Sequence, residues 1–248
     1  MNRFLPIKLK SALLVLLSAV FIFFSSQIMG AILISVLGRI LGYSTDAISN
    51  GIESNDLVRF IMILFIETIT VWLVFMVLQS QKSNLQSIGL TAKIKFSYLL
   101  EAVKGYGIYI LIFLAVFVFV SKVGLINTDQ AQELGFKNPT GVGLLLAFVS
   151  LVILPPIAEE ILFRGYLYQR LKLSINSKIA AIITSALFAT AHLELGSAST
   201  PNWAAALDTF ILSFVLIYLA NKTKSLYASI FLHAIKNCIA FVTLFVIK

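Results

Sequence analysis

Apolar runs long enough to cross a lipid bilayer follow one another along most of this 248-residue chain. Hydrophobic residues make up 59% of the sequence and charged residues only 12%, and the mean hydropathy is +0.97. This composition is too apolar for an ordinary soluble domain. A helix needs about 20 mostly apolar residues to span a bilayer, and several runs reach that length. We therefore expect an all-α, polytopic transmembrane helical bundle.

The apolar runs predict seven spans, or eight if the Pro155-Pro156 pair divides the fourth run. An internal proline removes a helical hydrogen bond and clashes with the preceding turn, so the pair could end one helix and start another. The predicted spans are 12–37, 58–79, 99–121, 141–165 with a helical continuation to about 172, 178–195, 204–220 and 225–247.

The distribution of basic residues predicts how the chain is oriented. Lys and Arg accumulate in cytoplasmic loops of membrane proteins, and in the seven-span arrangement twelve lie on the side of the N-terminus against five on the other. The first group is Arg3, Lys8, Lys10, Lys82, Lys93, Lys95, Arg164, Arg170, Lys172, Lys178, Lys222 and Lys224, and the second is Arg39, Arg59, Lys122, Lys137 and Lys248. We expect a cytoplasmic N-terminus in the plasma membrane. The same bias accounts for the net charge of +8, so we expect no nucleic-acid partner.

Two adjacent acids, Glu159 and Glu160, interrupt the fourth apolar run. Ionisable groups at membrane depth are costly and usually face a protein interior or a water-filled cavity. Arg164 lies four residues after Glu160, about one helical turn away, and can neutralise one of the two acids. The pair could also be interfacial and solvated, but the apolar pattern continues after it. The other carboxylate is therefore a candidate for chemistry.

The chain contains only two histidines, and both fall on predicted spans at a depth similar to that of Glu159. A rise of 1.5 Å per residue, counted from the nearest basic loops, places Glu159 at roughly 20 Å, His192 at roughly 21 Å and His233 at roughly 16 Å. Residues four apart share a helix face, so Phe188 accompanies His192 and Asn237 accompanies His233. We expect these side chains to meet in one pocket near the middle of the membrane.

This set of side chains suits the hydrolysis of a peptide bond. Desolvation raises the proton affinity of a carboxylate, which makes it a good general base toward water. A histidine can hold that water or help to bind a metal, and a second histidine with an amide can stabilise an oxyanion. The sequence lacks His-Glu-x-x-His and Gly-x-Gly-Asp, which excludes a single-helix zinc site and the aspartyl type of intramembrane protease.

Three motifs, Glu159-Glu160-x-x-x-Arg164, Phe188-x-x-x-His192 and His233-x-x-x-Asn237, resemble those of the CAAX-prenyl-protease and bacteriocin-processing (CPBP, Abi) family of intramembrane proteases. Their order and placement on helices agree as well, and the resemblance covers about residues 141–247. We therefore divide the chain into N-terminal transmembrane helices with a linker, residues 1–140, and a catalytic transmembrane core of the CPBP type, residues 141–248.

The resemblance implies a role for each motif residue. Glu159 would be the base that activates water, His192 its partner, and His233 with Asn237 the pair that stabilises the oxyanion. Glu160, Arg164 and Phe188 would support them. Glu159, His192 and His233 could hold a divalent metal such as zinc only as an unusual set from three helices, so we expect that no metal is required.

Two other functions compete with a protease that acts on a membrane-associated peptide or protein. A non-proteolytic membrane scaffold or regulator, for example in bacteriocin immunity, could use the same fold, although here all three motifs are complete. A small transporter could use Glu159, Glu67 and Asp208 as a proton path, but the chain shows no duplicated halves. The fold alone does not select a substrate.

Overall fold

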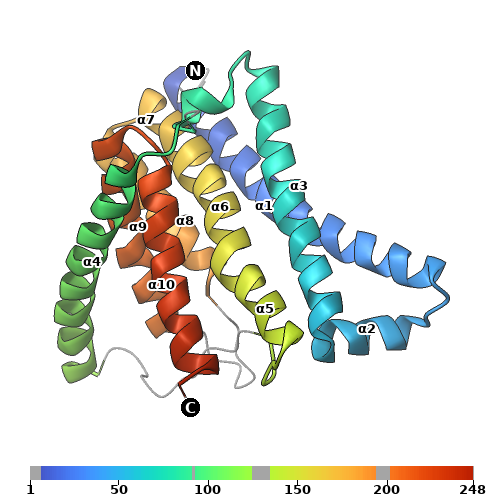
Figure 1. The fold of residues 1–248 in the computed structure, drawn as a ribbon. Coiled ribbons are helices and arrows are strands. Elements are labelled where there is room, and N and C mark those ends of the chain that lie inside the picture. The colour runs from blue at the N-terminus through green and yellow to red at the C-terminus, as the bar shows by residue number, and fades with distance from the viewer. Residues whose placement is uncertain (1–6, 91–92, 125–134, 194–201, 248) are drawn as a thin grey trace.

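The computed structural model describes residues 7–90, 93–124, 135–193 and 202–247, and every element in these ranges is a helix (Figure 1). The first part of the chain forms α1 (Ile7–Ile40), α2 (Thr45–Ser54), α3 (Asp56–Ser80), the short helix η1 (Leu85–Ile88) and α4 (Phe96–Lys122). A helical series from Val142 to Ser174 follows, and then α8 (Ser177–Ala191), α9 (Trp203–Thr223) and α10 (Tyr227–Phe245).

Six of the described helices are long and apolar enough to cross a membrane. They are α1, α3, α4, the continuous series Val142–Ser174, α9 and α10. Large apolar side chains such as Phe21, Leu111 and Phe119 are exposed on their outer faces, where lipid replaces water as the solvent. The expected all-α polytopic bundle is confirmed, and the chain is an integral membrane protein.

The fourth span is one continuous helical series, so the eighth span does not arise. It passes from α5 (Val142–Phe148) through the π-helical segment η2 (Val149–Ile153) to α6 (Leu154–Glu159), the π-helical segment η3 (Glu160–Tyr168) and α7 (Gln169–Ser174). Both prolines lie in the first turn of α6, directly after the wider turn of η2. The wider π-helical turn accommodates the two prolines, so the helical series continues through them although two backbone donors are missing.

The fifth predicted span, 178–195, is shorter than expected. Asn176 caps α8 by accepting a hydrogen bond from the Lys178 N–H, and the helix ends at Ala191 with His192 as its C-cap. Fifteen residues cover about 22 Å, less than the bilayer core of about 30 Å. Residues 194–195 of the prediction lie outside the described residues.

The two ends of the bundle carry different segments of the chain (Figure 1). The N-side, as we call it, holds the start of α1 and the α3–α4, α7–α8 and α9–α10 connections. The C-side holds α2, the start of α5 and the end of α10. The described ends of the chain lie on opposite sides because the six long helices and the shorter α8 together make an odd number of passes (Figure 1).

The main hydrophobic core surrounds η3 and draws on both halves of the chain. Leu162 and Leu167 of η3 pack in one buried cluster with Ile22 of α1 and Leu78 of α3. The Ser18 and Tyr166 hydroxyls are 2.7 Å apart, which adds a polar contact between α1 and η3. Helices α1 and α3 thus brace η3, which begins at Glu160.

Candidate active site

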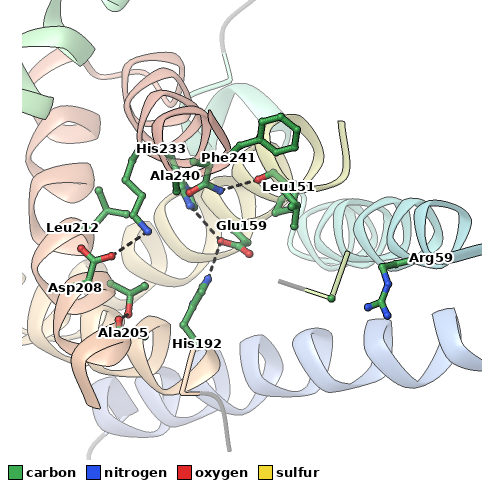
Figure 2. Close-up of a pocket in the computed structure, with 15 residues that line it drawn as sticks. Arg59, Leu151, Glu159, His192, Ala205, Asp208, Leu212, His233, Ala240 and Phe241 are labelled. Atoms are coloured by element: carbon green, nitrogen blue, oxygen red, sulfur yellow. Dashed lines mark hydrogen bonds and ion pairs between the residues drawn. The ribbon is translucent and has the colours of Figure 1, made fainter. Parts of the chain in front are cut away.

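Glu159, His192 and His233 come together at the centre of the bundle, although α6, the end of α8 and α10 supply one residue each (Figure 2). The Glu159 Oε2 atom lies 3.6 Å from His192 Nε2 and 3.8 Å from His233 Nε2. The Glu159 side chain is 18% exposed, whereas that of Glu160 is fully buried. Of the two adjacent acids, Glu159 is the one that a molecule in the pocket can reach.

The orientation of His192 follows from the end of α8. Its Nδ1 atom lies 2.9 Å from the Phe188 carbonyl oxygen. A carbonyl only accepts hydrogen bonds, so Nδ1 carries a hydrogen and, in the neutral ring, the lone pair of Nε2 faces Glu159. The Phe188 ring packs against the imidazole with centroids 4.4 Å apart. Phe188 therefore holds His192 through both its backbone and its side chain.

Glu160 does not line the pocket but orients His233 from the buried interior of the bundle. Its Oε1 atom accepts a hydrogen bond from Arg164 Nη1 at 2.8 Å and lies 3.1 Å from His233 Nδ1. The guanidinium carbon of Arg164 is 4.1 Å from the centroid of the Phe188 ring, and both members of the ion pair are fully buried. The structure therefore brings together all three residues that the resemblance gives a supporting role.

Asn237 lines the pocket, but its amide is already engaged. Its Nδ2 atom donates to the Leu151 carbonyl at 2.9 Å (Figure 2). That carbonyl would find its α-helical partner at residue 155 and its π-helical partner at residue 156, and both are prolines without an N–H. Asn237 thus supplies a donor that the Pro155-Pro156 pair removes, and only its second amide hydrogen is left for a substrate.

The pocket beside Glu159 has a volume of about 360 Å³ and contains charged residues that sequence reasoning did not assign to the site. Lys236 Nζ lies 3.0 Å from Asp208 Oδ2, and the Tyr109 hydroxyl donates to the other oxygen of Asp208. Arg59, near the start of α3, lines the same pocket. The signal for the ion pair was visible, because Asp208 and Lys236 are charges inside apolar spans, but only the structure brings them together.

The donor set at Glu159 was also tested as a metal site. A carboxylate oxygen and two imidazole nitrogens are ligands that zinc accepts, usually at 2.0–2.2 Å. In the part of the chain that the structure describes, however, no group of three His, Cys, Asp or Glu side chains could hold a metal ion. We derive no step of the reaction through a metal ion.

Fold and site together define a polytopic membrane protein in which an acid and two imidazoles line a pocket buried among the helices. Residues 141–239 match the family model described as type II CAAX prenyl endopeptidase Rce1-like. The match confirms, for this region, the resemblance to the CAAX-prenyl-protease and bacteriocin-processing family.

One curated relative is the UPF0177 protein YxdF of Lactococcus lactis subsp. lactis, which is 29% identical over 121 residues. The matched segment covers 48% of this chain and 62% of that protein, so the chain spans less than two thirds of the relative's length. No solved structure matches the chain.

Proposed function

We propose that this protein is an intramembrane endopeptidase that hydrolyses a peptide bond in a membrane-associated peptide or protein. One observation carries the proposal. Glu159 Oε2 lies within 4 Å of the Nε2 atoms of His192 and His233 and faces a pocket large enough for a peptide segment. Its neighbour Glu160 is buried and forms an ion pair with Arg164, which leaves Glu159 as the acid available for catalysis.

The attacking water is held between Glu159 and His192. The 3.6 Å separation is too long for a direct hydrogen bond, and both facing atoms are acceptors when Glu159 is ionised and His192 is neutral. A water molecule that donates one hydrogen to each satisfies both atoms and turns its oxygen toward the substrate. Glu159 removes one proton as that oxygen attacks the carbonyl carbon.

The oxyanion that forms on the carbonyl oxygen needs hydrogen-bond donors. The second amide hydrogen of Asn237 is one donor, and His233 Nε2 is another when both ring nitrogens carry hydrogen. As the intermediate collapses, the C–N bond breaks and protonated Glu159 returns its proton to the leaving amine. Side chains from three helices thus activate the water, stabilise the oxyanion and transfer the proton.

The test compares wild type with Glu159→Gln, a substitution of equal shape that cannot accept the proton. Proteoliposomes of each form are incubated with membrane extracts, and the peptides released are identified by mass spectrometry. We expect product formation by Glu159→Gln to fall by about 10²–10⁴-fold, the usual contribution of a positioned general base. His192→Ala should lose cleavage too, and Glu53→Gln, an exposed acid on α2, should retain it.

If Glu159→Gln releases the same peptides as wild type, the protease assignment is wrong and a non-proteolytic scaffold or regulator takes its place.

We also propose that hydrolysis proceeds without a bound metal. Purified protein dialysed against a chelator should keep its full cleavage rate, and elemental analysis should find less than stoichiometric zinc. Loss of cleavage on dialysis, restored by zinc alone, would assign the reaction to a metal held by Glu159, His192 and His233.

A further inference from the structure

The pocket beside Glu159 is built only from the C-side portions of the helices that line it. The α9 residues are Ala205, Asp208, Thr209 and Leu212, all in the first half of that helix. The α10 residues run from His233 to Phe241, after its first turns, and Arg59 and Gly135 belong to segments at the C-side. The lining stops at Glu159 on the fourth span and does not extend to residues after it.

Packed side chains close the opposite direction among the described residues. Toward the N-side, Glu159 is followed by Glu160, Arg164 and Tyr166, each at most 1% exposed. Leu216 of α9 and Phe188 of α8 are fully buried at the same levels. A substrate that approached from the N-side would have to displace the ion pair that orients His233.

The basic residues identify the N-side as cytoplasmic. Arg164 is buried in the bundle and does not belong to a loop, so among the described residues ten Lys and Arg flank the spans on the N-side against four on the C-side. This excess still follows the positive-inside rule.

We infer that the pocket opens to the extracytoplasmic face and that its substrates are peptides or protein segments already on that side of the membrane. The identity of the substrates rests on the proposed protease function, whereas the direction of access does not. A lipid-modified protein tail that stays in the cytosol cannot reach Glu159 by this route.

Cysteine labelling in intact cells tests the direction of access. Cys238→Ser removes the native thiol. Single cysteines are then placed in the pocket (Ala205→Cys, Ala240→Cys), on the C-side surface (Asn50→Cys) and on the N-side surface (Ser177→Cys). The probe is a maleimide that carries a sulfonate and does not cross membranes. We expect it to label the first three variants in intact cells and Ser177→Cys only after permeabilisation.

Three results would overturn the inference: pocket cysteines that react only in inverted vesicles, pocket cysteines that react from neither side, or a reversal of the Asn50→Cys and Ser177→Cys patterns. A second readout concerns the substrate. In intact cells, the adduct at Ala205→Cys should abolish release of the peptides identified for wild type, measured against the same variant without probe. The adduct at Asn50→Cys should not.

The two proposals fail separately. External labelling together with unchanged products from Glu159→Gln would retain the direction of access and reject the protease. Loss of products in Glu159→Gln together with labelling only from the cytoplasmic side would do the reverse.

Discussion

The side-chain amide of Asn237 satisfies a backbone carbonyl that the local sequence leaves without a partner. Two consecutive prolines remove both helical donors for Leu151, and a buried unsatisfied carbonyl is costly, most of all in a membrane. The residue that the resemblance assigns to the oxyanion therefore also fixes the distance between α10 and the fourth span. The sequence motif identifies Asn237 as a site residue, but only its hydrogen bond to Leu151 shows that it also has a structural role.

Asn237→Ala should reduce stability as well as activity. Loss of the donor leaves the Leu151 carbonyl unpaired, which costs about 1–3 kcal/mol. Asn237→Asp should behave similarly, because an ionised carboxylate accepts hydrogen bonds and cannot donate one. Thermal unfolding in detergent measures the effect, and Asn50→Ala, at an exposed position on α2, is the control. An unchanged midpoint for Asn237→Ala would show that the contact contributes nothing to stability.

Substitutions at Glu160 and Arg164 should have coupled, non-additive effects on the free energy of unfolding, because the two side chains form a buried ion pair. Arg164→Met leaves the Glu160 carboxylate buried without its cation, which should cost about 3–5 kcal/mol. The double substitution Glu160→Gln/Arg164→Met removes both charges and should recover part of that loss. Urea or thermal unfolding of the two singles and the double gives the coupling energy. Additive losses would mean that the ion pair is not what stabilises the site.

At the scale of the element, close contact between helices depends on a glycine. A Cβ atom at Gly105 of α4 would lie 2.7 Å from Leu232 Cδ1 and 2.8 Å from Leu219 Cδ1, closer than van der Waals contact allows. Small residues of this kind let transmembrane helices approach closely. Nothing lies within 4 Å of the corresponding point at Gly107, two residues further along the same helix.

Gly105→Leu and Gly107→Leu therefore form a matched pair. The first overpacks the interface of α4 with α9 and α10 and should cost about 1–3 kcal/mol. The second adds an apolar side chain on an exposed face and should leave stability nearly unchanged. Thermal unfolding of the two variants side by side tests this, and equal midpoints would contradict the packing argument.

The apolar runs were enough to predict where six long helices lie, because a helix that crosses a bilayer must be both long and apolar. The type of helix around the acids could not be predicted. Whether Pro155-Pro156 ends a helix or lies beside a π-helical turn depends on a donor from α10, more than 80 residues away in the sequence. The early end of α8 was missed as well, because Leu193 and Leu195 continue the apolar sequence after Ala191.

On the scale of the whole molecule, the proposed boundary at residue 140 divides the sequence but not the core. Ala19 and Ile22 of α1 and Val74 of α3 belong to the same buried cluster as Phe163 and Leu167 of η3. Family resemblance covers the second part of the chain, yet the packing that holds the paired acids extends into the first. The first part of the chain therefore supports the site through α1 and α3 and also supplies Arg59 and Gly135 to the pocket lining.

A chain that begins at residue 141 should insert into membranes but lack a stable site. Without α1 and α3, apolar side chains of η3 lose their partners, and each buried large side chain contributes about 1.5–3 kcal/mol. Co-expression with a separate chain of residues 1–140 should restore resistance to protease digestion in the membrane. Full resistance of the shorter chain alone would make residues 141–248 an independent folding unit.

The convergence of Glu159, His192 and His233 shows how far sequence reasoning reaches. Counting residues from the basic loops placed the three side chains at a common depth, and the structure brings both imidazoles within 4 Å of the Glu159 carboxylate. The count treats each helix as a separate rod, so it contains no information on pairs such as Asp208 and Lys236, which depend on how neighbouring helices are rotated.

The early end of α8 has a consequence for the supply of the second reactant. The helix stops at Ala191, well short of the C-side (Figure 1), and its last turn is closed by bonds from the His192 and Leu193 N–H groups to the Ala189 and Thr190 carbonyls. Because α8 does not continue past the pocket, His192 lies at a helix end with its side chain 25% exposed, where the water that the proposed hydrolysis consumes can reach it.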